Sequence, residues 1–319
     1  MATARKSVDL VLEGGGVKGI GLLGAVLTLH DAGYRFERIA GTSAGAIVAA
    51  LVATYQRAGK DLNELRDVMT SCEYHKFKDA KFAQHLTGPF GDAEQLAFHD
   101  GMHTGGYLYD WLGPLLESTG ITRFRDLRLD DPGTSLADYQ RYGLVVNTSD
   151  LSRHCLVRLP WDYQHYGAVA EDQLIVDAVR ASMSFPFFFR PIEFKPATGG
   201  AVTWVDGGLL SNFPITIFDR TDGQPERWPT WGIKLSADPV PNDHPVRTGI
   251  GIAIESLKTL MDDWNAYCLN DEGVNQRTIM VDTTGISTLD FDLTADQEHT
   301  LFDNGQAAAR KFLARQPVR

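Results

Sequence analysis

The sequence VDLVLEGGGVKG, residues 8–19, decides the fold class of this chain. Its first part is a short apolar run with β-branched residues, which predicts a buried strand over residues 8–12, and the three consecutive glycines predict a tight turn after that strand. From Val17 to Ala32 apolar residues recur at helical spacing, and Gly33 is typical of a helix C-terminus. The stretch therefore predicts a strand, a turn and a helix in direct succession.

The same order repeats in the next part of the chain. Residues 38–41 predict a second short strand, residues 42–58 predict a helix of small apolar residues, and Gly59 marks the end of that helix. Strands that alternate with helices are typical of a parallel sheet covered by helices. We therefore expect an α/β fold with a mostly parallel central sheet.

The rest of the chain predicts further elements of both kinds. Helices are expected over residues 107–117, 172–182, 250–267 and 295–314. Strands are expected over residues 143–146 and 154–159, paired around a turn at Ser149–Asp150, and over residues 203–205, 232–235 and 278–281. Residues 67–106 mix lysines with phenylalanines and predict an insertion or a lid. No internal repeat or low-complexity linker is found, which favours one domain over residues 1–319, with a catalytic core at about 8–215 and C-terminal elements at about 230–316.

The composition narrows the class of protein. The chain has 319 residues, 43% of them hydrophobic, and a formal net charge of −11, which argues against binding to nucleic-acid polymers and against anchoring on anionic lipid by charge. Three scattered cysteines without a CxxC pair argue against a disulfide framework or a cysteine-rich zinc site, and we expect neither a metal nor a cofactor. No apolar run has the length of a signal peptide or of a membrane span, so we expect a cytoplasmic protein.

A candidate nucleophile lies in the sequence Gly41-Thr42-Ser43-Ala44-Gly45, a GxSxG pattern between a predicted strand and a predicted helix. A serine at a sharp strand-to-helix turn is held in a strained backbone conformation, and small neighbours let the substrate approach it. The helix that follows places its positive end near an oxyanion formed by attack of the serine. The pattern indicates a catalytic Ser43, with a glycine-rich turn and a capping serine as the structural alternative.

The glycines Gly14, Gly15 and Gly16 form a second candidate site. Consecutive glycines leave backbone N–H groups unshielded, which suits them to bind an oxyanion or a phosphate. Gly14, Gly16 and Gly19 also match the GxGxxG pattern of dinucleotide-binding proteins, which gives an alternative function. Glu37 argues against that alternative, because it lies before the second strand and not at its C-terminal end.

A candidate general base is Asp206, which ends a predicted strand and is followed by Gly207 and Gly208. A carboxylate in that position can be exposed in a cleft, although an isolated Asp-Gly-Gly is also typical of a simple turn. None of the nine histidines lies in a recognisable catalytic sequence. Only two predicted strands precede Ser43, which is too few for the α/β-hydrolase arrangement with its catalytic histidine.

Taken together, these residues resemble the patatin-like phospholipase family. The resemblance is carried by residues 14–19, 41–45 and 206–208, in the order the family has them, and by VRASMSFPFFF at 179–189 and SNFP at 211–214. It extends from about Val8 to Ile215 and is weaker in the last third of the chain.

The resemblance implies a three-layer α/β/α sandwich and a bacterial-type lipid acyl hydrolase with a Ser–Asp dyad. It assigns Ser43 as nucleophile, Asp206 as general base, and Gly14, Gly15 and Gly16 as the oxyanion hole. It assigns supporting roles to Lys18, Gly41, Gly45, Gly207 and Gly208. A carboxylate can act as the base if partial burial raises its pKa toward neutrality.

We therefore expect hydrolysis of phospholipid or lysophospholipid esters through an acyl-enzyme, with transient peripheral contact with a membrane. A general serine carboxylesterase for small soluble esters and, third, a dinucleotide-binding protein are the alternatives; the oligomeric state stays open. Phe185 and Phe187–Phe189 are candidates for an acyl-chain groove or for core packing. Candidates for lipid contact, or for a solvated helix face, are the basic and aromatic residues Lys76, Phe77, Lys78, Lys81 and Phe82.

Overall fold

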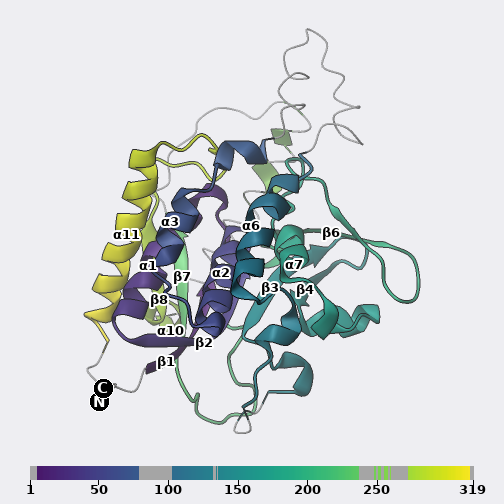
Figure 1. Ribbon diagram of the computed structural model, residues 1–319, viewed down its shortest axis with the longest axis horizontal. Coiled ribbons are helices and arrows are strands. Elements are labelled where there is room, and N and C mark those ends of the chain that lie inside the picture. The colour runs from purple at the N-terminus through teal and green to yellow at the C-terminus, as the bar shows by residue number, and fades with distance from the viewer. Residues whose placement is uncertain are drawn as a thin grey trace.

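The computed structural model of the chain shows a central sheet with helices packed along it (Figure 1). The structure describes residues 6–78, 103–131, 134, 136–236, 248, 251–252, 255–257, 259 and 272–316. Within these ranges no helix is both long and apolar enough to cross a membrane.

The sheet has eight strands in the order β5-β6-β3-β2-β1-β7-β8, and β4 pairs with β3 outside this path. Their bounds are β1 Lys6–Leu12, β2 Tyr34–Thr42, β3 Leu144–Asp150, β4 Cys155–Leu159, β5 Ile192–Phe194, β6 Val202–Asp206, β7 Thr230–Ser236 and β8 Thr278–Asp282. The pairs β3–β2, β2–β1, β1–β7 and β7–β8 are parallel. Strands β4 and β6 run antiparallel to β3, and β5 antiparallel to β6. The predicted α/β fold with a mostly parallel sheet is confirmed.

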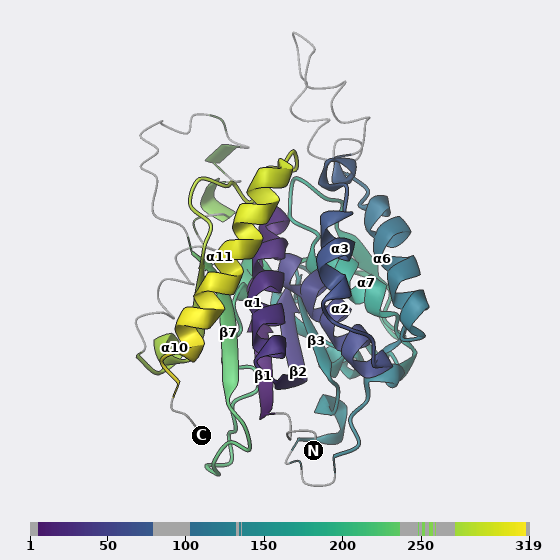
Figure 2. The ribbon, with the colours of Figure 1, turned by 60° about the vertical axis from the view of Figure 1, so that its left-hand side comes forward.

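The α-helices are α1 Gly19–Asp31, α2 Ala44–Ala58, α3 Glu64–Thr70, α6 Gly106–Thr119, α7 Ile175–Ser182, α8 Gly208–Ser211, α10 Glu272–Gln276 and α11 Ala295–Leu313. Short 3-10 helices are η1 Gly16–Lys18, η2 Tyr74–Phe77, η3 Phe124–Leu127, η4 Asp138–Gln140, η5 Trp161–Tyr166 and η6 Ala170–Asp172. The long helices α1, α2 and α11 cover one face of the sheet, with α11 against α1 (Figure 2). A Cβ atom at Gly305 of α11 would lie 2.0 Å from the Gly21 carbonyl oxygen of α1, so this close crossing requires a glycine.

The opposite face of the sheet is covered by the segment that follows α8. Lys234 Nζ of β7 lies 5.7 Å from the centroid of the Phe213 ring, and the Arg38 guanidinium of β2 lies 4.6 Å from that of Phe218. The side chains of Phe213 and Phe218 are buried. The sheet therefore lies between two layers, as a three-layer arrangement requires.

One predicted turn is wrong. Ser149 and Asp150 are not a turn but the buried end of β3, and the chain turns at residues 151–154. Polar residues are typical of exposed turns, but the Asp150 carboxylate has hydrogen-bond donors inside the protein. Its Oδ2 accepts hydrogen bonds from the Tyr166 hydroxyl at 2.7 Å and from Trp204 Nε1 at 3.3 Å. The predicted helix at 250–267 lies mostly outside the described residues. The described parts of the predicted insertion, residues 67–78 and 103–106, include the end of α3 and all of η2.

Strands β2 and β6 follow one another along the same edge of β3. Strand β4 pairs with residues 146–150 of β3, so it occupies one edge; β2 pairs with residues 144–147 and β6 with residues 148–150, which places both on the other edge. Strand β2 ends with Thr42 opposite Asn147, and β6 ends with Asp206 opposite Thr148. The C-terminal ends of β2 and β6 therefore meet head to head, and the residue after Thr42 is Ser43.

Candidate active site

Ser43 forms a strained turn between β2 and α2. Its φ is 52° and its ψ −120°, a conformation that costs a non-glycine residue about 1–3 kcal/mol. The Ser43 carbonyl accepts hydrogen bonds from the N–H groups of Ala46 at 2.9 Å and Ile47 at 3.3 Å. The regular hydrogen bonding of α2 therefore begins directly at the strained residue. The half-buried Ser43 side chain is thus presented at the positive end of α2.

The two glycines of the GxSxG sequence are required by close backbone contacts. A Cβ atom at Gly41 would lie 2.3 Å from the Gly45 carbonyl oxygen, and a Cβ at Gly45 would lie 2.4 Å from the Leu12 carbonyl oxygen. Both distances are far below van der Waals contact. Gly41 and Gly45 therefore support the turn by leaving room for it.

Asp206 is a buried acid whose pKa is raised by its surroundings. Its side chain is 1% exposed, and its Oδ1 accepts the Gly208 N–H at 2.7 Å. Among the described residues, no donor forms a hydrogen bond of normal length and angle to its Oδ2. Burial raises the pKa of Asp206 to about 7, against the lowering effects of the Gly208 N–H and the Ser43 hydroxyl. Gly207 lets the chain turn here, because a Cβ on it would lie 2.3 Å from the Asn147 carbonyl oxygen.

The glycine loop, residues 14–16, follows β1 and runs into η1, and two hydrogen bonds join it to Asn212. The Gly14 N–H donates to the Asn212 carbonyl at 3.1 Å, and Asn212 Nδ2 donates back to the Gly14 carbonyl at 3.2 Å. The N–H groups of Gly15 and Gly16 have no acceptor among the described residues. The Lys18 N–H donates to the Gly15 carbonyl at 3.2 Å, so Lys18 supports the loop through its main chain. Two successive N–H groups therefore remain available at this loop.

Ser182, the last residue of α7, forms hydrogen bonds with Ser43 and with Gly207, the residue after Asp206. Its Oγ accepts the Ser43 N–H at 2.9 Å, and its carbonyl accepts the Gly207 N–H at 3.3 Å. Neither Ser182 nor Asn212 is a site residue by the sequence reasoning, although both lie in the segments that carry the family resemblance. No local sequence pattern identifies them, because their contacts with the site are formed only in the folded chain. In sequence, 139 positions separate Ser43 from Ser182, and 198 separate Gly14 from Asn212.

A cavity of about 200 Å³ is lined by the residues predicted as nucleophile, base and oxyanion hole, whereas the predicted supporting residues Lys18, Gly41, Gly45, Gly207 and Gly208 do not line it. Gly14, Gly15, Gly16, Ser43, Asp206 and Asn212 line it. The rest of its lining is mainly apolar and aromatic: Val17, Ala44, Ile47, Tyr74, Phe77, Met183, Phe185, Phe189, Leu289 and Phe291. A hydroxyl, a buried carboxyl group and free N–H groups thus lie at the wall of an apolar cavity, which suits attack on an acyl group.

The aromatic candidates divide into three groups. Phe185 and Phe189 line the cavity, whereas Phe188 stacks on Phe291 with ring centroids 4.7 Å apart, and Phe187 is 40% exposed. Phe77, one of the candidates for contact with a lipid surface, is buried: it lines the cavity, and its ring lies 4.9 Å from the Tyr107 ring.

The lysines beside Phe77 form ion pairs, Lys76 with Glu73 and Lys78 with Asp292, both at 2.5 Å. Lys81 and Phe82 lie outside the described residues.

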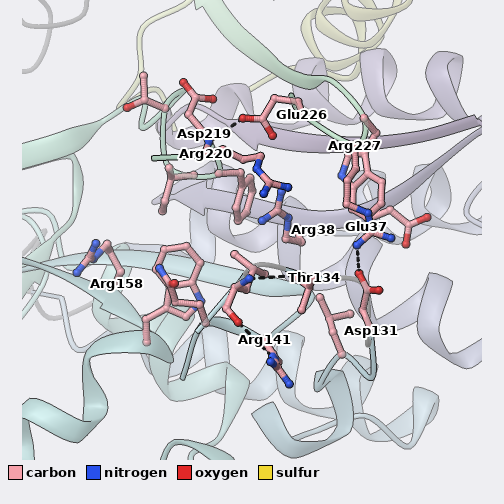
Figure 3. Close-up of a pocket in the computed structure, with 18 of the residues that line it drawn as sticks. Glu37, Arg38, Asp131, Thr134, Arg141, Arg158, Asp219, Arg220, Glu226 and Arg227 are labelled. Atoms are coloured by element: carbon pink, nitrogen blue, oxygen red, sulfur yellow. Dashed lines mark hydrogen bonds and ion pairs between the residues drawn. The ribbon is translucent and has the colours of Figure 1, made fainter. Parts of the chain in front are cut away.

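A larger cavity, of about 890 Å³, contains none of the predicted site residues. Arginines from several elements line it, among them Arg38, Arg158 and Arg227 (Figure 3). Each of the three pairs with a carboxylate: Arg38 with the buried Asp9, Arg158 with Asp162 and Arg227 with Asp131. We therefore place the candidate active site at the smaller cavity. In the described part of the chain, no group of three or more His, Cys, Asp or Glu residues is arranged to hold a metal ion.

Comparison with known proteins gives the family. The profile of the patatin-like phospholipase family matches residues 10–219. YqhO of Bacillus subtilis (strain 168) is 31% identical over 96% of this chain and 98% of its own length. Lysophospholipase NTE1 of Coccidioides immitis (strain RS) is 31% identical over 82% of this chain, which spans 13% of that longer protein. The crystal structure of VipD from Legionella pneumophila has a TM-score of 0.54 at 18% identity, covering 98% of this chain and 67% of that one, a likeness in fold. The chain belongs to the patatin-like phospholipase family.

Proposed function

We propose that this chain is a lipid acyl hydrolase of the phospholipase A or lysophospholipase type, which cleaves carboxylic ester bonds with Ser43 and Asp206. The observation that carries the proposal is the buried Asp206 carboxyl group, with a pKa of about 7, at the head-to-head strand ends where Ser43 forms its strained turn. A base with a pKa near the operating pH is the most effective in accepting a proton from a hydroxyl group.

In the first step Asp206 accepts the proton of the Ser43 hydroxyl, and Ser43 Oγ attacks the ester carbonyl carbon. The carbonyl π electrons move to the oxygen, which becomes an oxyanion. The N–H groups of Gly15 and Gly16 bind this oxyanion, and the loss of one such donor typically costs about 2.7–4 kcal/mol of barrier. Gly14 serves the loop differently from the sequence expectation, because its N–H donates to Asn212.

In the second step the carbon–oxygen bond to the alcohol breaks, and the leaving alkoxide takes the proton from Asp206. Ser43 now carries the acyl group. A water molecule then gives a proton to Asp206 and attacks the acyl carbon, which releases the carboxylic acid and returns the proton to Ser43.

The apolar lining supports a lipid as substrate. Phe185, Phe189 and Phe291 surround the space beside Ser43 and would bury the methylene groups of an acyl chain. Family membership and the similarity to a lysophospholipase point the same way. We propose that the protein meets its substrate during transient contact with a membrane surface.

The proposal is tested by incubating the protein with phosphatidylcholine, with lysophosphatidylcholine and with p-nitrophenyl esters, and measuring the acid released. We expect release from at least one of the lipids and none from the Ser43→Ala variant. Ser287→Ala removes another serine hydroxyl of the same cavity and is the matched control. Hydrolysis of short p-nitrophenyl esters without hydrolysis of any lipid would instead support the general carboxylesterase.

A further inference from the structure

The strained turn at Ser43 is held from outside by a hydroxyl group of α7. The Ser43 N–H donates to Ser182 Oγ at 2.9 Å, and Ser182 is 0% exposed. A buried N–H group without an acceptor is unfavourable, so this bond stabilises the Thr42–Ser43 peptide in the orientation that the strained φ of Ser43 requires.

The same residue is bonded next to the candidate base. The Ser182 carbonyl accepts the N–H of Gly207, the residue that follows Asp206, at 3.3 Å. One residue therefore binds the main chain at the nucleophile through its side chain and the main chain at the base through its backbone.

We propose that Ser182 is a positioning residue that fixes the distance and direction from Ser43 Oγ to the Asp206 carboxyl group. This inference rests on the proposed function. Ser182 does not line the cavity, so it acts through Ser43 and not on the substrate. A displacement of about 1 Å between reacting groups can reduce a rate on the order of 100-fold, and without the hydroxyl acceptor the strained turn can relax by such an amount.

The sharpest test is a pair of variants that have the same shape. Ser182→Thr adds one methyl group at a buried position, and Ser182→Val adds that methyl group and replaces the hydroxyl with a second one. The two variants therefore differ only in the oxygen that accepts the Ser43 N–H. We expect kcat of the threonine variant to exceed that of the valine variant by about tenfold or more, with KM values within about twofold of each other. Ser182→Ala is expected to lower kcat by about 10- to 100-fold relative to wild type.

Ser184→Ala is the matched control, because the Ser184 carbonyl accepts the Asp206 N–H at 3.0 Å, and the alanine variant keeps this backbone bond just as Ser182→Ala keeps the bond to Gly207. Ser184 is also 0% exposed, and its Oγ accepts from Arg180 Nη1 at 2.6 Å and donates to the Arg180 carbonyl at 2.9 Å. Its removal loses at least as many hydrogen bonds as the removal of the Ser182 hydroxyl. We expect kcat of Ser184→Ala within about threefold of wild type, even where its melting temperature falls as far as that of Ser182→Ala.

Equal kcat values for the threonine and valine variants, or an equal loss in Ser184→Ala and Ser182→Ala, would overturn the positioning role. Ser43→Ala, assayed in parallel, separates this failure from failure of the proposed function. If Ser43→Ala is inactive, only the role of Ser182 is rejected; if it is as active as wild type, the proposed function itself is rejected.

Discussion

Thr42 and Asp206 end two strands that run toward each other along the same edge of β3, opposite the neighbouring residues Asn147 and Thr148. This arrangement brings the residue after Thr42, the serine of the GxSxG sequence, to a buried carboxyl group that is distant in sequence. The parallel strand β2 and the antiparallel strand β6 are both needed for it, because parallel strands that share an edge cannot meet with their C-terminal ends.

The pH dependence of activity should follow Asp206. Its burial raises the pKa to about 7, and only the ionised carboxylate can accept the Ser43 proton. We expect kcat/KM for a neutral ester to rise with pH through about 7 and to reach a plateau above it. A profile that is flat from pH 5 to pH 9, measured on protein shown to be folded across that range, would contradict Asp206 as the base.

The same burial should make Asp206 a cost to stability. An acid whose pKa is raised in the folded state binds its proton more tightly there, so its unfavourable contribution is absent below pH 4 and complete above pH 7. We expect Asp206→Asn to be more stable than wild type at pH 8 by on the order of 3 kcal/mol, and by much less near pH 4. Urea unfolding of both proteins at the two pH values measures this, and an asparagine variant that is less stable at pH 8 would argue against it.

Asp9 and Arg38 join the two strands that carry the glycine loop and Ser43. Arg38 Nε donates to Asp9 Oδ2 at 3.0 Å, and the exposed fractions of the two residues are 0% for Asp9 and 8% for Arg38. Burial raises the pKa of Asp9, and Arg38 opposes that rise. We expect Arg38→Met to lower the free energy of unfolding at pH 8 by about 3–5 kcal/mol, since it leaves a buried carboxylate unpaired. The Asp9→Asn, Arg38→Met double variant should recover much of the loss; a double variant less stable than Arg38→Met would contradict the pairing.

Ile47 offers a test of where the acyl chain lies. Its side chain lines the cavity one helical turn after Ser43. Ile47→Trp should fill part of the apolar space and therefore lower kcat/KM for a p-nitrophenyl ester of a long acid about tenfold or more. The acetate ester should be affected less than about threefold. Equal losses for both esters would show that the chain does not occupy this space.

The sequence predicts the central elements because their signals are local. The strand–glycine–helix order at residues 8–58 depends on contacts within a few residues or between adjacent strands. The same holds for the glycines that flank Ser43. Ser149 and Asp150 are mistaken for a turn because their burial depends on β6 and η5, which come later in the chain. The sequence leaves lipid contact and a solvated face open for residues 76–78, because no local pattern shows that the two lysines face solvent while the Phe77 ring packs inward.

The fine arrangement of the site depends on partners distant in sequence. No local pattern shows that Asn212 takes the Gly14 N–H, which leaves Gly15 and Gly16 as the available donors. No local pattern shows that Ser182 accepts the Ser43 N–H either. Both facts follow from the way α7 and the segment after α8 pack against the ends of the strands.

The most direct measurement of the central claim is peptide mapping by mass spectrometry after reaction with a fluorophosphonate. The account predicts one covalent adduct, on Ser43, formed by the wild-type protein and at least tenfold more slowly by Asp206→Asn, because the asparagine cannot accept the proton. An adduct on another residue, or labelling of Ser43 at the same rate in both proteins, would contradict the Ser43–Asp206 dyad.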